Sequence, residues 1–135
     1  MTLHGSDRRL PLYALVDWDP DGIGILSTYK HGSAVLQRHD NPLLPGIHWL
    51  GLRSTHLTDA NAGNDLRSLL ALTDRDRRKA SKMLEWDHVG GVDGERSWRR
   101  ELQLMLMLGY KAEIQALDET TRGVSEWVRQ RLVEG

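Results

Sequence analysis

The sequence predicts an α/β protein with a layered fold, in which helices flank a mainly parallel sheet. Residues Leu12–Val16 form an unbroken apolar run, which is typical of a strand buried in a parallel sheet. Residues Lys111–Leu117 alternate between polar and apolar side chains, which is the period of a strand. Stretches with helical spacing lie between and after these two segments. Strands that alternate with helices along a chain indicate an α/β layer fold.

The first strand, which we expect to be buried on both faces, ends at the acidic turn Asp17–Gly22. Pro20 suits the first position of a helix, with Asp19 as its N-cap. Apolar residues then follow helical spacing up to a glycine stop at Gly32. Two short strands are expected next, at residues 33–37 and 47–52.

The middle of the chain predicts one or two helical turns around Leu66, Leu69 and Leu70, followed by a longer helix. Thr73 and Asp76 have the spacing of a capping box, so this helix should begin there and continue to about Glu85. Residues 86–94 contain three glycines and are expected to form a loop.

The last third of the chain predicts a helix over residues 98–108, which Gly109 closes at the usual C-cap position. The alternating strand over residues 111–117 follows. A final amphipathic helix is indicated by the apolar residues Val124, Trp127, Val128 and Leu132.

The composition fits one folded domain. Of 135 residues, 39% are hydrophobic and 27% are charged, which excludes a disordered polyelectrolyte and a membrane-spanning protein. We expect a polar lead-in at residues 1–11 and one domain over residues 12–135. The chain has no cysteine, which excludes disulfides, thiolate metal sites and cysteine nucleophiles. The net charge of −1 points to no particular partner, although twelve of the eighteen basic residues lie after position 70.

The acidic turn contains the strongest candidate site. Asp17 and Asp19 are two positions apart at a strand end, so both carboxylates can face one cation. Ligands of open α/β sheets also bind beyond the carboxyl ends of strands. We therefore predict that these two residues bind Mg²⁺, with Asp21 as a first-turn acid that favours the helix dipole. The alternative is that the aspartates only form the turn and cap the helix.

Two other families share part of this pattern. A calcium-binding EF-hand loop needs a glutamate at its twelfth position, where this chain has Thr28, so the EF-hand is excluded. The turn also resembles the first motif of haloacid dehalogenase phosphatases, in which the two aspartates act as nucleophile and general acid. Those enzymes carry a hydroxyl residue where this chain has Asp21, and no convincing lysine motif follows. The phosphatase is the second hypothesis.

A longer resemblance rests on five blocks that follow one another along the chain. The blocks are residues 16–23, 29–33, 47–52, 72–76 and the C-terminal signature formed by 101–106 with 109–117. In this order they resemble the Toprim domain of the A subunit of DNA topoisomerase VI and of its relative, the meiotic double-strand-break protein (sporulation protein eleven). The match extends from Leu12 to the end of the chain, and its Trp- and Arg-rich composition resembles the fungal meiotic proteins more closely.

The resemblance implies a Toprim-like fold and a function in DNA cleavage. In that family a tyrosine attacks a backbone phosphate and makes double-strand breaks, while Mg²⁺ at the Toprim acids stabilises the developing charge. By matching position, Asp17 and Asp19 are those acids. The implied partners are double-stranded DNA, a second copy of the chain and a topoisomerase VI B-like subunit. The implied location is the nucleus, on chromosomes, or the cytoplasm for an archaeal protein.

This chain departs from the family pattern in two ways. The family's metal-binding glutamate lies on an earlier strand, but the first glutamate here is Glu85. The nucleophilic tyrosine belongs to an upstream winged-helix domain, and we expect Tyr13, Tyr29 and Tyr110 to serve in packing instead. The chain is thus expected to be the C-terminal part of a family protein, unable to cleave DNA alone. A third hypothesis is a non-catalytic remnant that binds DNA or dimerises.

Basic residues supply the candidate DNA contacts. Arg75, Lys79 and Lys82 fall on one helical stripe and could contact phosphates, which dominate DNA affinity. The alternative is a solvated helix face with local acidic partners. Lys30, next to Gly32 at the end of the first helix, is a further candidate. The spacing of the six histidines does not favour a zinc site. Glu113 belongs to the family signature, but the sequence does not indicate its role.

Overall fold

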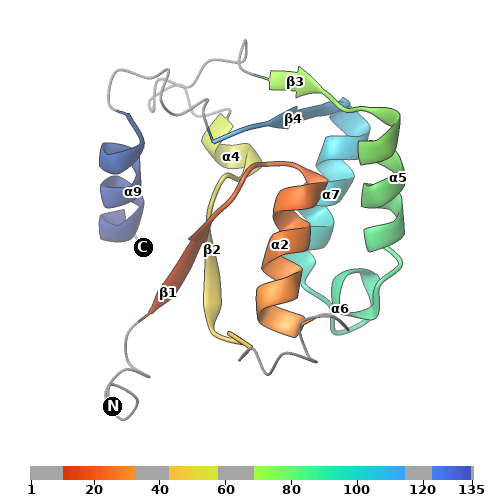
Figure 1. The fold of residues 1–135 in the computed structure, drawn as a ribbon, viewed down its shortest axis with the longest axis horizontal. Helices are drawn as coiled ribbons and strands as arrows, with labels where there is room; N and C mark the ends of the chain where they lie inside the picture. The colour runs from red at the N-terminus through yellow and green to blue at the C-terminus, as the bar shows by residue number, and fades with distance from the viewer. Residues whose placement is uncertain (1–10, 33–42, 58–68, 115–122, 135) are drawn as a thin grey trace.

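The computed structural model describes residues 11–32, 43–57, 69–114 and 123–134. Helices and short strands are mixed along the described chain, as predicted for an α/β protein (Figure 1). The elements are β1 (Leu12–Leu15), α2 (Pro20–His31), β2 (Ile47–Gly51), α4 (Ser54–Leu57), β3 (Leu69–Ala71), α5 (Asp74–Met83), α6 (Asp87–Gly90), α7 (Arg96–Leu108), β4 (Tyr110–Ala112) and α9 (Gly123–Glu134).

The described strands form two small sheets. Strands β1 and β2 pair in parallel, with Leu12 opposite Ile47, whereas β3 and β4 pair antiparallel. Trp18 and Ala112 join the two sheets, because the backbone N–H of each donates to the carbonyl of the other at 2.8 and 3.0 Å. The prediction of a mainly parallel sheet is therefore correct only for the β1–β2 pair. The expected strand at residues 33–37 lies outside the described residues.

Strand β1 is less buried than predicted. Leu12 and Tyr13 are exposed, and Ala14 and Leu15 are half-buried, so the prediction of a strand buried on both faces is wrong. The first part of β1 extends away from helices α2, α5 and α7 (Figure 1). Val16 is the first buried residue of this segment and belongs to the hydrophobic core.

Helix α2 follows its local sequence signals. Asp19 caps it, accepting a 2.6 Å hydrogen bond from the Gly22 N–H, and Pro20 occupies its first turn. Gly32 ends the helix at a φ of 84°, a conformation that glycine adopts without strain. The predicted helix is confirmed at both ends.

Helices α5 and α7 also begin and end close to the predicted positions. The capping box of Thr73 and Asp76 is present, and Gly109 closes α7 in the left-handed conformation. Leu69 and Leu70 form part of strand β3, so their prediction as helical turns is wrong. Residues 87–90 form the short helix α6 within the expected loop.

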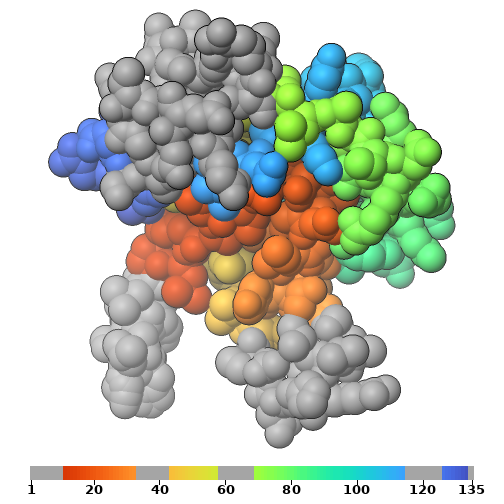
Figure 2. All heavy atoms as spheres, turned by 45° about the horizontal axis from the view of Figure 1, so that its top comes forward, coloured from red at the N-terminus to blue at the C-terminus, as the bar shows by residue number. Residues whose placement is uncertain are grey.

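The core lies where α2, α5 and α7 meet the two sheets, and α2 packs against α5 while α5 packs against α7. In the space-filling view, α2 and α5 adjoin on the face turned to the reader (Figure 2). No helix in the described part of the chain is long and apolar enough to cross a membrane. The least exposed large side chains are Trp18, Ile23, Leu26, Leu52, Met83, Leu102, Met105 and Val89.

Asp76 connects α5 to β4. It accepts hydrogen bonds from the Thr73 N–H at 3.0 Å and from Lys111 Nζ at 2.7 Å. Burial alone would raise the pKa of Asp76, but the bonds from Lys111 and Thr73 outweigh burial and lower it. The carboxylate form is therefore the stabilised form in the folded protein.

Replacing Asp76 should remove part of the acid sensitivity of the fold. The stabilisation is present above the ordinary aspartate pKa of about 4 and is lost as the pH falls through the lowered pKa. Between about pH 6 and about pH 3, we expect Asp76→Asn to lose about 1 kcal/mol less unfolding free energy than the wild type. Urea denaturation at each pH measures this, with the exposed Asp74→Asn as the control. Equal losses in the wild type and Asp76→Asn would contradict it.

Candidate metal site and basic surfaces

The acidic turn lies directly after β1, where the chain passes from the parallel pair into α2. Asp17 Oδ1 accepts a 2.7 Å hydrogen bond from the Ile114 N–H, beyond the end of β4. Asp19 Oδ1 accepts the capping bond from Gly22. The second oxygen of each carboxylate makes no hydrogen bond to the described residues. Two half-buried carboxylates thus each retain one oxygen for a further ligand.

The electrostatics of Asp19 suit a bound cation. Burial raises the pKa of Asp19, the hydrogen bond from Gly22 opposes this, and the neighbouring Asp17 and Asp21 raise it further. A cation beside this cluster would relieve the repulsion. Mg²⁺ binds through one or two carboxylates and keeps several waters, so the available oxygens fit it. Within the described residues, however, no three His, Cys, Asp or Glu side chains are grouped to hold a metal.

Asp21 faces helix α5 instead. Lys79 Nζ lies 2.6 Å from its Oδ1, and Arg75 Nη1 lies 3.2 Å from its Oδ2. The hydrogen bond from Lys79, with that from Arg75, lowers the pKa of Asp21 despite partial burial. Two of the predicted DNA contacts are therefore ion-paired to the acidic turn. Both residues pair with Asp21 of the acidic turn. The alternative of a solvated helix face had expected acidic partners within α5 itself.

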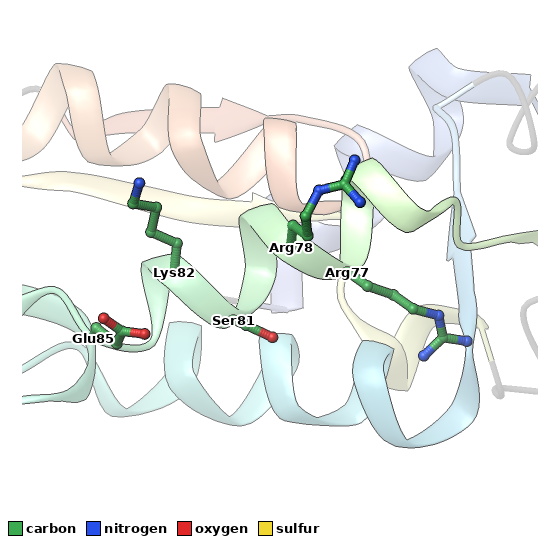
Figure 3. Close-up of a pocket in the computed structure, with 5 residues that line it drawn as sticks. All are labelled: Arg77, Arg78, Ser81, Lys82 and Glu85. Atoms are coloured by element: carbon green, nitrogen blue, oxygen red, sulfur yellow. The ribbon is translucent and has the colours of Figure 1, made fainter.

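Lys82, the next residue of the predicted stripe, lies on another part of α5. It lines a pocket of about 350 Å³ with Arg77, Arg78, Ser81 and Glu85. In the close-up, Lys82 and Arg78 extend from one side of the helix, whereas Arg77 and Ser81 extend toward α7 (Figure 3). The structure thus divides the predicted basic stripe into a paired half beside the turn and an exposed half around this pocket.

Lys30 lies at the opposite end of α2 from the acidic turn, in a polar cluster that spacing alone did not indicate. Its Nζ is 2.8 Å from Glu95 Oε2, which also lies 2.8 Å from His31 Nε2. The rings of His31 and His88 are 4.4 Å apart, and Ser27 Oγ lies 2.6 Å from His88 Nε2. Burial, followed by the neighbouring His31, lowers the pKa of His88. This cluster ties α2 to the segment before α7.

The three tyrosines are more exposed than expected. Tyr13, Tyr29 and Tyr110 are 45%, 50% and 46% exposed, so only about half of each residue is covered by the rest of the protein. Tyr13 stacks obliquely on His48, with 5.4 Å between ring centroids. None of the three forms a hydrogen bond with the acidic turn in the described residues. Glu113 is also exposed, just beyond β4.

Comparison with known proteins gives a consistent result. Residues 3–132 match the family model for the Toprim domain of Spo11 and of the topoisomerase 6 A subunit. The "Meiotic recombination protein SPO11" of Homo sapiens is 39% identical over 110 residues, which cover 81% of this chain and 26% of the human protein. The "Meiotic recombination protein SPO11-1" of Oryza sativa subsp. indica is 37% identical over 130 residues, 94% of this chain and 33% of that protein.

A plant topoisomerase is similar to the same degree. The A subunit of DNA topoisomerase 6 from Arabidopsis thaliana is 41% identical over 112 residues, 82% of this chain and 25% of its own length. The chain therefore spans about a quarter to a third of the length of these relatives. Relatives from mammals and plants do not single out the fungal type that the sequence suggested.

Proposed function

Because the chain belongs to the Toprim family of Spo11 and the topoisomerase 6 A subunit, we propose that it is a magnesium-dependent DNA-binding module. The protein of which it is a module makes DNA double-strand breaks by tyrosine transesterification in meiotic recombination. The module extends over residues 12–135, after a lead-in at 1–11, and has a Toprim-like layered fold. The observation that carries this proposal is the family match over nearly the whole chain, with its two aspartates at the end of a parallel strand.

Asp17 and Asp19 hold the Mg²⁺ in this proposal. Their free oxygens, the raised pKa of Asp19 and the family match support this assignment. The bound ion would stabilise charge on a DNA phosphate and position it. Asp17 is oriented by the Ile114 N–H and Asp19 by the Gly22 N–H, so the turn holds both carboxylates in place before any ligand arrives.

Basic residues beside the turn would contact the DNA backbone. Arg75 and Lys79 lie at the rim of the turn through their pairs with Asp21, and Lys82 lies further along the same helix. Lys30 is held by Glu95 at the far end of α2, so it would contact DNA only beyond the metal site. Contacts of this kind position the DNA without reading its sequence.

The cleavage reaction is proposed for the longer family protein. By the family resemblance, its nucleophile would be a tyrosine of the longer protein, and not Tyr13, Tyr29 or Tyr110. The proposed partners are double-stranded DNA, a second copy of the chain and a topoisomerase VI B-like subunit. The proposed location is the nucleus. The family match favours this function over the phosphatase hypothesis.

A magnesium titration followed by amide NMR tests the proposal. We expect shifts centred on Asp17–Gly22, with a dissociation constant of about millimolar because only two carboxylates bind the ion. A short DNA duplex should tighten the binding. Asp17→Asn and Asp19→Asn should each weaken it at least about tenfold. Asparagine caps helices as well as aspartate does, so Asp19→Asn leaves α2 intact.

The exposed Asp93→Asn provides the matched control, because it removes the same charge away from the turn. Binding should also weaken as the pH falls through the raised pKa of Asp19, since protons then compete with the metal. Micromolar binding, or equal effects of Asp93→Asn and Asp17→Asn, would contradict the proposed site. Intact folding with no shift at the turn would favour a structural remnant.

A further inference from the structure

A further polar site lies between the residues that follow β2 and the first turns of α7. It is a cavity of about 330 Å³. Three arginines and three hydroxyl side chains contribute to it, together with one buried carboxylate. The lining residues are Arg53, Ser54, Thr55, Arg96, Ser97, Arg100 and Glu101.

The described residues that line this cavity carry a net positive charge. Arg96 and Arg100 are exposed and form no ion pair with any described residue. Arg53 is half-buried and fixed in place, because its Nε and Nη2 donate to the Trp49 carbonyl at 3.2 and 3.0 Å. Its guanidinium lies 4.8 Å from the centre of the Trp49 ring. Three cations therefore face one carboxylate.

That carboxylate, Glu101, is already engaged on both oxygens. Its Oε1 accepts from Trp18 Nε1 at 2.7 Å and from the Ser54 N–H at 2.8 Å, and its Oε2 accepts from Ser54 Oγ at 3.0 Å. Glu101 is 5% exposed. It therefore serves as a wall of the cavity that holds Ser54 in position, and it leaves the guanidinium groups of Arg96 and Arg100 to an incoming anion.

The first turn of α7 contributes Arg96 and Ser97 to the same cavity. Glu95 occupies the N-cap position of this helix but makes no capping bond, since its side chain pairs with Lys30 and His31. Its carboxylate is thus engaged elsewhere and is not among the lining residues. The arginines and the hydroxyls of Thr55 and Ser97 suit a tetrahedral oxyanion, which arginine binds through paired N–H donors.

We propose that this cavity is a phosphate-binding site, formed by Arg53, Arg96 and Arg100 with the hydroxyls around them. The phosphate group comes either from a DNA backbone or from a free phosphate or nucleotide. The DNA source rests on the proposed function, whereas phosphate binding itself does not. Glu101 accepts a hydrogen bond from Trp18, the residue between Asp17 and Asp19 in the sequence, so one buried hydrogen bond connects the two proposed sites.

Amide NMR of the full chain, titrated with inorganic phosphate in the absence of divalent metal, tests the inference. We expect shifts at the amides of residues 53–55 and 96–97. Arg96→Gln and Arg100→Gln should each weaken phosphate binding by about three- to tenfold. Arg129→Gln removes the same charge from an exposed position on α9 and should change nothing at these amides.

A short duplex then distinguishes the two sources. The phosphate belongs to DNA if the duplex displaces inorganic phosphate and reverses its amide shifts. The slope of log K for duplex binding against log salt concentration should then fall by about one for each arginine removed. Phosphate shifts that duplex does not displace support the site with a free phosphate or nucleotide as its ligand. Asp17→Asn should leave the phosphate shifts unchanged, so failure of the metal proposal would be seen separately. Absence of shifts at residues 53–55 and 96–97, or equal weakening by Arg129→Gln, would overturn the inference.

Discussion

Glu101→Ala is expected to lower the free energy of unfolding by about 3–5 kcal/mol, because each buried donor left without an acceptor costs about 1–3 kcal/mol. The variant removes the hydrogen bonds that Trp18 Nε1 and the Ser54 N–H donate to Glu101 Oε1. Trp18 is 2% exposed, so its indole N–H lies within the core and depends on this carboxylate for its acceptor. The truncation also leaves a cavity between α7 and the sheet.

Glu101→Gln separates the hydrogen bonds from the charge. The amide oxygen can still accept from Trp18 and Ser54, and the amide N–H can donate to the Ser54 hydroxyl. We therefore expect a loss of about 1–2 kcal/mol, well below that of the alanine variant. Urea denaturation followed by tryptophan fluorescence measures both variants. Equal losses for alanine and glutamine would show that packing, and not the hydrogen bonds, is the main contribution of this residue.

Gly22→Ala should destabilise the protein by about 1–3 kcal/mol, the usual cost of overpacking, and should also weaken metal binding. A Cβ on Gly22 would lie 2.2 Å from the Asp17 carbonyl oxygen and 3.2 Å from Asp19 Oδ1. The Asp17 carbonyl belongs to the backbone, so the turn itself must move to admit a methyl group. That movement should change the spacing of the two carboxylates that we propose as ligands.

Gly24→Ala is the matched control on the same helix. Its Cβ would lie 3.6 Å from Lys79 Cε and Nζ, an ordinary contact distance. Alanine is favoured over glycine in a helix by about 1 kcal/mol, so this variant should be neutral or stabilising. Thermal unfolding and the magnesium titration together test the pair. Unchanged magnesium binding in Gly22→Ala would contradict the proposed role of the turn geometry.

The local signals of the sequence predicted the helix ends well. Asp19, Thr73 and Gly109 act on backbone groups within one turn of themselves, so the sequence around each is sufficient. The prediction of helical turns at Leu69 and Leu70 is wrong because Leu66, Leu69 and Leu70 alone do not distinguish a helical period from a strand period. Their strand exists because β4 pairs with it, and β4 lies about 40 residues further along the chain.

The candidate site was predictable in part, for the same reason. The spacing of Asp17 and Asp19 after an apolar run is a local pattern, and it is enough to indicate a metal site. The partners of Asp21 on α5, and the contact between Trp18 and Glu101, join residues 54 to 83 positions apart. Such pairs depend on how the helices pack over the sheets, which no local pattern encodes.

The hydrogen bond from the Ile114 N–H to Asp17 links the proposed metal site to the residue just beyond β4. Asp17 Oδ1 accepts this bond, which leaves Oδ2 for the proposed ion. Loss of the Ile114 bond would change the affinity of the proposed site for the ion, and by thermodynamic reciprocity ion binding would change the strength of that bond by the same factor. A single backbone amide is thereby coupled to the acidic turn.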